Sequence, residues 1–432
     1  MSKKKILFIH QNFPAQYKHL APILSKSNNY EVYSLSLDIP ANPSLKKLGE
    51  HLKEITHYKY SIKVSNADNV NRLAIEFETK MIRAQAVLDK CLNLKETGLE
   101  PDLLIIHPGW GEGFLLKEVW PNAKILNYFE FYYNTKQSDV DFDLSESNRP
   151  NYDIDLKAKL VARNAPFLSA CNQSDIMISP TEFQKSTAPL EYQEKIKVIH
   201  DGVDTKVIKS NPNANLILTK THKESGKIEK TTLTKKDKVI TFVNRNLEPY
   251  RGYHIFMRSL PDILKKHPDA YVLIIGGDSV SYGAKPKNGS YKDLYYNEVK
   301  DKLPKKNNVM FLGFVEYDVL LSAFNIASAH IYLTYPFVLS WSMLESMSLG
   351  GLVVGSKTPP VEEVIKHKKN GLLVDFFDSK ALSSIVIDIL DNPKNYKNIR
   401  SEARKTIVEN YDLHNKCLPE QLKIIKGLLD ER

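Results

Sequence analysis

Short apolar runs that alternate with helical patterns constrain the fold of this chain more than any other feature. Each run is short enough for a strand buried in a parallel sheet, and each stops at polar residues, glycine or proline. The second series of runs extends from Val239–Val243 to Leu372–Val374. Two successive β/α series predict an α/β fold with two doubly wound, Rossmann-like lobes that face each other across a cleft. The first series consists of Lys5–Ile9, Tyr30–Leu37, Leu103–His107, Lys124–Tyr128 and Asp175–Ser179.

The length of the chain also favours two lobes. Its 432 residues exceed one ordinary hydrophobic core, and two domains of roughly 200 residues each are the natural division. We place the first lobe over residues 1–195 and the second over residues 196–410. Residues 205–238 show little periodicity and contain seven lysines between Lys220 and Lys238. We expect this stretch to be a surface linker or loop that is mobile or irregular.

The composition narrows the class of protein. No apolar run approaches the ~18 residues that a spanning helix needs, and the N-terminus lacks the small-residue cleavage site of a secretory signal. Cys91, Cys171 and Cys417 are scattered and have no paired spacing, so we predict neither disulfides nor a cysteine zinc site. This pattern fits a reducing compartment, and we expect a cytoplasmic protein.

The net charge of +9 is compatible with two kinds of anionic partner, namely phosphorylated ligands and the inner face of a membrane, to which the protein would attach peripherally. The alternative is a Lys-rich surface that is simply solvated. The sequence contains no zinc finger, no RRM-type aromatic motif and no dense arginine block. We therefore predict no nucleic-acid partner.

The stretch Thr334–Gly355 reads as the end of a strand, a tight turn, a short helix and the start of the next strand. Ser340 and Ser342 stand where the helix can begin, and Glu345 lies three residues after Ser342. A helix that opens from a parallel strand directs free backbone N–H groups at a crevice, and that end attracts anions. We interpret the crevice as a site for the diphosphate of a nucleotide-sugar, with Glu345 accepting hydrogen bonds from ribose. The alternative for Glu345 is a capping-box partner of Ser342.

Arg245 and Arg251 flank a turn, NRNLEPYRG, that follows another apolar run of the second lobe. Arginine provides a planar fork of donors that suits phosphate oxygens, so we predict that both bind the diphosphate. The alternative is a pair of solvated arginines. Gly277 and Gly313 end further strands and would let the ligand approach the backbone closely, although glycines are also ordinary turn formers.

Polar side chains also follow the strands of the first lobe. His107, Trp110, Gly111 and Glu130 come after strand ends, where open α/β sheets keep their ligands. We expect them on the side of the cleft that presents the acceptor, the molecule that receives the sugar. The alternative for His107 is a buried structural histidine. The sequence Asp141-Phe142-Asp143 has the form of a metal-binding DxD, but it lies in an acidic surface run, so we predict no metal site.

With these residues placed, the chain resembles the glycosyltransferases of family 4, which are retaining enzymes of GT-B fold. The block TYPFVLSWSMLE is similar to one bacterial subgroup, and Ile196–Asp204 resembles the inter-lobe signature of the family. The likeness spans nearly the whole chain. It is strongest in Val239–Gly252, Val309–Val315, Thr334–Gly355 and Pro360–Asp378.

The resemblance implies roles for single residues. Arg245 and Arg251 match the basic pair that binds the donor diphosphate, and Glu345 matches the glutamate that binds ribose. Trp341 and Ser342 match positions whose backbone N–H groups meet the phosphates. Residues 411–432 match the helix that crosses back to the first lobe.

The chain also departs from the family pattern. Phe337 replaces the first glutamate of the E-x7-E motif, which usually contacts the donor sugar. Ser340 stands at a position that is often glycine, and Glu130 stands where many members carry a histidine. Gln11 and Asn12, with the preceding histidine, replace the glycine pair of the first loop; we place both on the acceptor side.

The resemblance implies a retaining, hexosyltransferase-type glycosyltransferase. It would move a sugar from a UDP- or GDP-sugar to a hydroxyl of a glycan, lipid-linked or small-molecule acceptor, in cell-surface polysaccharide or glycolipid synthesis, without a bound cofactor or a metal. Arg245, Arg251 and the helix start would stabilise the departing diphosphate, while Glu130 or His107 would orient the acceptor or assist proton movement. The alternatives are a GT-B epimerase or phosphorylase, and a non-catalytic subunit that binds nucleotide-sugar or glycan. The sugar, the acceptor and the oligomeric state stay open.

Overall fold

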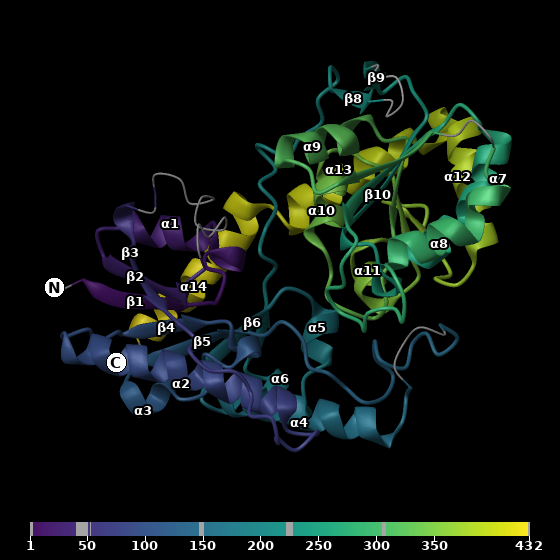
Figure 1. Cartoon of the computed structure of the whole chain (residues 1–432). Helices are drawn as coiled ribbons and strands as arrows, with labels where there is room; N and C mark the ends of the chain where they lie inside the picture. The colour runs from purple at the N-terminus through teal and green to yellow at the C-terminus, as the bar shows by residue number, and fades with distance from the viewer. Residues whose placement is uncertain are drawn as a thin grey trace. The chain divides into compact units, whose positions relative to one another are not determined.

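The computed structural model describes residues 3–39, 51, 53–146, 151–221, 228–304 and 308–430. The chain divides into two compact units (Figure 1). Unit 1 comprises the described parts of Met1–Gln137, Tyr152–Gly202 and His414–Arg432, and unit 2 those of Ser138–Asn151 and Val203–Leu413. Each unit is built around its own parallel sheet with helices on both faces, which confirms the predicted α/β class.

Unit 1 contains a parallel sheet of seven strands. On one face lie α2 (Ile75–Glu96), α3 (Leu116–Val119) and α4 (Ile154–Asn172), and on the other α1 (Leu20–Ser25) and α14 (Leu418–Asp430) (Figure 1). The buried residues of the central strands are mostly apolar because both faces of the sheet are covered. In spatial order the strands are β3 (Thr56–Tyr60), β2 (Tyr30–Leu37), β1 (Lys4–Ile9), β4 (Leu103–Ile106), β5 (Lys124–Tyr128), β6 (Ile176–Ser179) and β7 (Ile196–Val198).

Unit 2 contains a parallel sheet of six strands. One core cluster lies between the sheet and α7 (Tyr253–Lys266), α8 (Tyr291–Val299) and α12 (Ser379–Asp391). A second cluster packs the other face against α9 (Tyr317–Ile326), α10 (Trp341–Ser348), α11 (Pro359–Val364) and α13 (Lys397–Asn410). In spatial order the strands are β12 (Asn308–Gly313), β11 (Tyr271–Gly277), β10 (Val239–Asn246), β13 (Ala329–Tyr332), β14 (Val353–Ser356) and β15 (Leu372–Val374).

The sequence predicted that the Lys-rich stretch 205–238 is mobile or irregular, and this prediction was wrong. The described part of the stretch contains an antiparallel hairpin. The hairpin pairs β8 (Asn215–Thr221) with β9 (Ile228–Thr234) and lies beside α9 (Figure 1). Leu216 and Leu233 are cross-strand partners and both are buried in the second core cluster. Alternating apolar positions therefore outweigh the lysine content here. Residues 222–227 of this stretch lie outside the described residues.

The acidic run that begins at Asp139 belongs by its contacts to unit 2, although it precedes α4 of unit 1 in the sequence. Asp143 is buried, with Oδ2 accepting a hydrogen bond from the Tyr335 hydroxyl at 2.8 Å and lying 3.2 Å from Nε2 of His254. Phe142 packs against Tyr335, with ring centroids 5.2 Å apart. These contacts anchor the run to unit 2. Residues 147–150 lie outside the described residues.

Across the described ranges, none of the helices is both long enough and apolar enough to span a membrane.

Candidate functional site

The predicted donor-side residues gather at one edge of the unit 2 sheet. Because β10, β11, β12 and β13 are parallel, their carboxyl ends meet at the same edge. Arg245 lies near the end of β10, Gly277 and Gly313 end β11 and β12, and Thr334 follows β13. Gly277 is register partner to Asn246, and a Cβ atom at Gly277 would lie only 2.6 Å from Asn246 Oδ1. The absence of a side chain there is a packing requirement.

Arg251 lies beneath this edge, in the short turn Pro249–Arg251 that leads into α7. It is only 4% exposed, and its Nη1 donates to Thr334 Oγ1 at 2.8 Å and to the Val338 carbonyl at 2.9 Å. The guanidinium carbon also lies 5.0 Å from the centroid of the Tyr282 ring, in cation–π range. Arg251 is therefore a cation fixed by the protein, with the five-donor fork of arginine held in one orientation.

The start of α10 lies against the same group of residues. Ser340 is the N-cap, and its Oγ accepts a hydrogen bond from the Ser342 backbone N–H at 3.3 Å. The Ser340 N–H donates to the Tyr332 hydroxyl at 2.8 Å, and Nη1 of Arg251 donates to that same hydroxyl at 3.4 Å. Tyr332 thus links the buried cation to the first turn of α10. The structure brings Arg251, Ser340 and Ser342 together as predicted.

Glu345 is not the capping partner of Ser342, because Ser340 performs the capping. Its carboxylate is buried and accepts a hydrogen bond from the Tyr317 hydroxyl at 2.8 Å. Burial raises the pKa of Tyr317, and the neighbouring Glu345 raises it further. Trp341, the first residue of α10, is half-buried.

Arg245 differs from Arg251 in its surroundings. Its side chain is exposed, and within the described part of the chain it forms no hydrogen bond and no ion pair. Phe337, which replaces the carboxylate expected from the family, is buried and lies 4.9 Å from the Tyr282 ring, centroid to centroid. It also lies 5.7 Å from the guanidinium carbon of Arg251. An aromatic cluster therefore occupies the position of that carboxylate.

Glu248 is a residue of this edge that the sequence reasoning missed. It is buried, and its carboxylate accepts hydrogen bonds from the backbone N–H groups of Ser281, Tyr282 and Gly283 at 3.1 to 3.4 Å. Burial raises the pKa of Glu248, in part against the effect of these donors and of Arg251. Glu248 thus ties the loop that carries Tyr282 to the turn that carries Arg251. The sequence feature that could have identified Glu248 was its position between two arginines in NRNLEPYRG.

Unit 1 holds the predicted acceptor-side residues at the carboxyl ends of β1, β4 and β5. His107 is buried, and its Nε2 lies 3.4 Å from Oε2 of Glu130. The His10 ring lies 5.0 Å away, edge to face, and Trp110 is stacked at 6.2 Å with 42% of its surface exposed. Burial lowers the pKa of His107, but Glu130, with a contribution from Glu112, outweighs this effect and leaves the pKa raised.

Gln11, Asn12 and Gly111 make contacts within unit 1. Gln11 Oε1 accepts a hydrogen bond from Arg83, and the Asn12 N–H donates to Nδ1 of His10 at 2.9 Å. Gly111 has φ +109°, and a Cβ there would lie 2.4 Å from the Lys80 carbonyl oxygen of α2. The glycine is required for this close approach.

Glu112 is the unit 1 residue that the sequence reasoning missed. It is buried, accepts a hydrogen bond from the Tyr60 hydroxyl at 2.9 Å and lies 3.9 Å from Nη1 of Arg83. Burial raises the pKa of Glu112, and Arg83 opposes the shift. Because Tyr60 and Arg83 are distant in sequence, no local pattern identifies this carboxylate as part of the cluster.

The described residues contain no group of three or more His, Cys, Asp or Glu side chains that could hold a metal ion. The carboxylates of the DxD-like sequence have structural partners. Asp141 accepts a hydrogen bond from the Ser138 N–H at 2.8 Å, and Asp143 contacts His254 and Tyr335.

The chain matches two family models that together cover most of its length. The model described as "Glycosyl transferase family 4 group" matches residues 41–208, and "Glycosyl transferases group 1" matches residues 224–406. The second match contains the carboxyl edge of the unit 2 sheet, and the first contains His107 and Glu130.

Individual proteins agree with these matches. An uncharacterized glycosyltransferase of Methanocaldococcus jannaschii is 28% identical over 179 residues, which are 41% of this chain and 42% of that protein. The chain spans less than half the length of such curated relatives.

Solved structures share the fold over nearly the whole chain. Anabaena Alr3699/HepE in complex with UDP and glucose has a TM-score of 0.67 at 15% identity and covers 98% of this chain and 100% of its own. Sucrose-phosphate synthase of Thermosynechococcus elongatus has a TM-score of 0.73 at 14% identity and covers 100% of both chains. Two glycosyltransferase family models thus match the two halves of the chain, which has the GT-B fold of a family 4-like glycosyltransferase.

Proposed function

We propose that the chain transfers a sugar from a nucleoside diphosphate-sugar to a hydroxyl acceptor. One observation carries this proposal: a fixed guanidinium, the first turn of α10 and an exposed arginine occupy the same sheet edge. Arg251 and Ser340 meet at the Tyr332 hydroxyl, and Arg245 lies at the end of the strand next to β13. A diphosphate needs such a combination of cations and backbone donors.

The chemical contribution of this edge would be electrostatic. As the bond between the sugar and the diphosphate breaks, negative charge grows on the phosphate oxygens, and preorganised donors stabilise that charge without reorganising. Arg251 is held in place by Thr334 and Val338. Arg245 is exposed and can turn toward a bound ligand. Glu345 would bind the ribose hydroxyls, with Tyr317 orienting its carboxylate.

On the acceptor side, we propose that His107 and Glu130 of unit 1 orient the acceptor hydroxyl. The Glu130 carboxylate is partly exposed, while the imidazole behind it is buried. This arrangement lets the carboxylate contact a ligand while His107 fixes its position. A leaving phosphate oxygen would take the acceptor proton, so that neither residue need act as a strong base.

The donor and the stereochemistry are further parts of the proposal. Solved structures of the same fold hold UDP with glucose and UDP-glucose, and one relative is described as GDP-mannose-dependent, so we propose a UDP- or GDP-sugar as the donor. We propose retention of the anomeric configuration, no metal requirement and a glycan, lipid-linked or small-molecule acceptor. Three free, buried cysteines fit action in the cytoplasm, and the net charge of +9 fits peripheral contact with an anionic membrane.

A thermal-shift screen with UDP-, GDP- and ADP-sugars, followed by mass analysis of products, tests the proposal. We expect one donor class to raise the melting temperature and to yield a glycosylated product whose anomeric configuration NMR shows to be retained. Conversion of the donor without acceptor would indicate an epimerase instead. Donor binding without turnover across a broad acceptor panel would indicate a binding subunit.

A further inference from the structure

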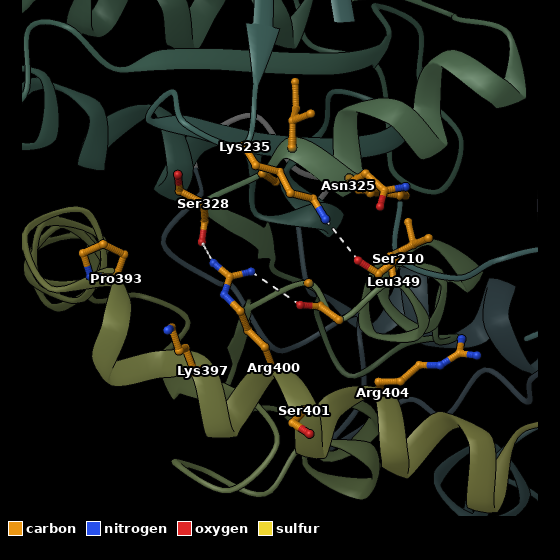
Figure 2. A pocket seen from close by; sticks show the side chains of 15 residues that line it. Ser210, Lys235, Asn325, Ser328, Leu349, Pro393, Lys397, Arg400, Ser401 and Arg404 are labelled. Atoms are coloured by element: carbon orange, nitrogen blue, oxygen red, sulfur yellow. Dashed lines mark hydrogen bonds between the residues drawn. The ribbon is translucent and has the colours of Figure 1, made fainter. Parts of the chain in front are cut away.

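A pocket of about 550 Å³ lies in unit 2 at the amino ends of β13 and β14 (Figure 2). Ser328, which precedes β13, and Gly350, which follows α10, form part of its wall. Its other sides come from the end of α9, from the turn after β9 and from α13. The volume lies within the range of about 300 to 1,000 Å³ that small-molecule sites occupy.

The charged side chains that line the pocket are all positive. Lys235, Lys397, Arg400 and Arg404 line it, and none of the described residues that line it is acidic (Figure 2). Burial lowers the pKa of Lys235, and the neighbouring Arg400 lowers it further. The ammonium and the guanidinium therefore repel each other across the pocket, and an anion placed there would relieve this repulsion.

The two arginines are positioned by backbone carbonyls. Arg400 donates to the carbonyl oxygens of Ser328 and Gly350 (Figure 2). Arg404 donates to the Ser348 carbonyl at 2.8 Å and to the Ser348 hydroxyl at 2.7 Å. Carbonyl groups orient a guanidinium without neutralising its charge. Asp412, which does not line the pocket, interacts electrostatically with Arg404, so the charge of Arg400 is the less compensated of the two. The pocket thus presents fixed positive charge.

The side chains of Lys235 and Lys397 are less constrained than those of the two arginines. Nζ of Lys235 donates to Ser210 Oγ at 3.0 Å (Figure 2). The Lys397 side chain is exposed and, in the described ranges, forms no hydrogen bond or ion pair. Both lysines can therefore change rotamer to reach a ligand, and neither holds the fold together.

This pocket is separate from the edge that carries Arg251. Ser328 precedes β13 and Thr334 follows it, so the two sites lie at opposite ends of the same strand. Four strand residues span about 13 Å. Leu349, which directly follows α10, also lines the pocket, whereas Ser340 and Ser342 lie at the opposite end of that helix. Neither site uses side chains of the other.

We propose that this pocket binds the phosphate group of an anionic ligand at a second site, distinct from the diphosphate site at the carboxyl edge. Lys235 and Lys397 would close on the phosphate oxygens, while Arg400 and Arg404 supply fixed charge behind them. A free phosphorylated small molecule and an anionic phospholipid headgroup share this chemistry.

The test combines calorimetry and hydrogen exchange on the full chain, with inorganic pyrophosphate as the probe. The pocket variant is Lys235→Glu with Lys397→Glu. The matched control is Lys265→Glu with Lys405→Glu, which reverses the same charge at exposed lysines of α7 and α13 outside the pocket. We expect pyrophosphate to protect residues 323–328, 349–351 and 393–404 from exchange. Its affinity there should fall about tenfold or more in the pocket variant and less than about twofold in the control.

A vesicle arm distinguishes the two sources of phosphate. If the wild type and the control co-sediment with phosphatidylglycerol vesicles but the pocket variant does not, the bound phosphate belongs to a lipid headgroup. If pyrophosphate protects the pocket and vesicles sediment none of the proteins, it belongs to a free small molecule. Protection confined to residues 245–251 and 334–342, with equal vesicle binding by both variants, would overturn the proposal. An equal loss of affinity in pocket and control variants would also overturn it.

Discussion

The guanidinium of Arg251 donates a hydrogen bond to the carbonyl oxygen of Val338 at 2.9 Å, within the segment that joins β13 to α10. The same nitrogen donates to Thr334 at the start of that segment. Arg251 therefore holds the segment that leads to the anion-attracting end of α10. Its role in shaping the site cannot be separated from its charge.

Arg251→Lys keeps the charge but removes the planar fork of donors. We expect the free energy of unfolding to fall by about 1 to 3 kcal/mol, because buried hydrogen-bond acceptors lose their partners. We also expect faster hydrogen exchange over residues 333–340. Chemical denaturation and exchange mass spectrometry measure the two effects. Arg258→Lys is the control, since Arg258 forms an exposed pair with Glu298 on the same unit. Equal effects in both variants would refute the structural role of Arg251.

Glu248→Gln weakens the anchor of the loop that carries Tyr282. Only one oxygen then remains to accept hydrogen bonds from the N–H groups of Ser281, Tyr282 and Gly283. We expect the affinity for the nucleotide-sugar to fall about 5- to 20-fold, roughly 1 to 2 kcal/mol, and hydrogen exchange at residues 281–283 to become faster. Glu298→Gln, on the surface of the same unit, should change neither quantity. Unaltered exchange in the Glu248 variant would contradict the anchoring role.

The pKa of His107 depends on Glu130. In the wild type, we expect the imidazole to titrate above its ordinary value of 6.5, because the carboxylates outweigh the effect of burial. In Glu130→Gln, burial then dominates, and the pKa should fall below the wild-type value. NMR of ¹³C-labelled histidine measures both, with His107→Gln assigning the signal. An identical titration in wild type and Glu130→Gln would rule out the coupling.

Asp143 makes the attachment of the acidic run sensitive to acid. Burial would raise the pKa of Asp143, but hydrogen bonding to His254 and Tyr335 lowers it to about 2, below its ordinary value of 3.8. Its contribution to stability is therefore complete above pH 3.8 and disappears as the pH falls toward 2. Asp143→Asn should cost about 1 to 2 kcal/mol at pH 6, after allowance for solvent screening, and less at pH 3.

Urea denaturation of the wild type and of Asp143→Asn at both pH values measures this difference. Asp141→Asn is the control, because Asp141 accepts a local hydrogen bond from the Ser138 N–H. A difference between wild type and Asp143→Asn that does not shrink on acidification would contradict the assignment.

Local patterns were sufficient for most elements and indicated which residues gather at the carboxyl edge of the unit 2 sheet. The run Tyr30–Leu37 is β2 with the predicted bounds, and the helix after Thr334 begins at the predicted serines. Strand periodicity and helix capping act over a few residues, so a single sequence contains them. The lysines around the β8–β9 hairpin obscured an equally local alternation.

Long-range contacts could not be predicted in the same way. Asp143 pairs with His254, and Glu248 accepts from Ser281 to Gly283, across stretches whose spacing follows from the complete fold. The burial of Arg251 depends on the segment after β13, which lies far along the chain. The sequence therefore indicated which residues meet at the edge, but not which of them the protein already holds in place.

The central claim is that the carboxyl edge of the unit 2 sheet binds a diphosphate, and Arg245→Ala tests it most directly. Arg245 is exposed and, in the described part of the chain, has no polar partner, so its removal should leave the fold intact. Calorimetry with UDP and with GDP compares the wild type, Arg245→Ala and the control Arg258→Ala. We predict that affinity for the nucleotide bound by the wild type falls about tenfold or more, at least ~1.4 kcal/mol, only in Arg245→Ala. Unchanged affinity in Arg245→Ala, or no binding of either nucleotide by the wild type, would contradict the account.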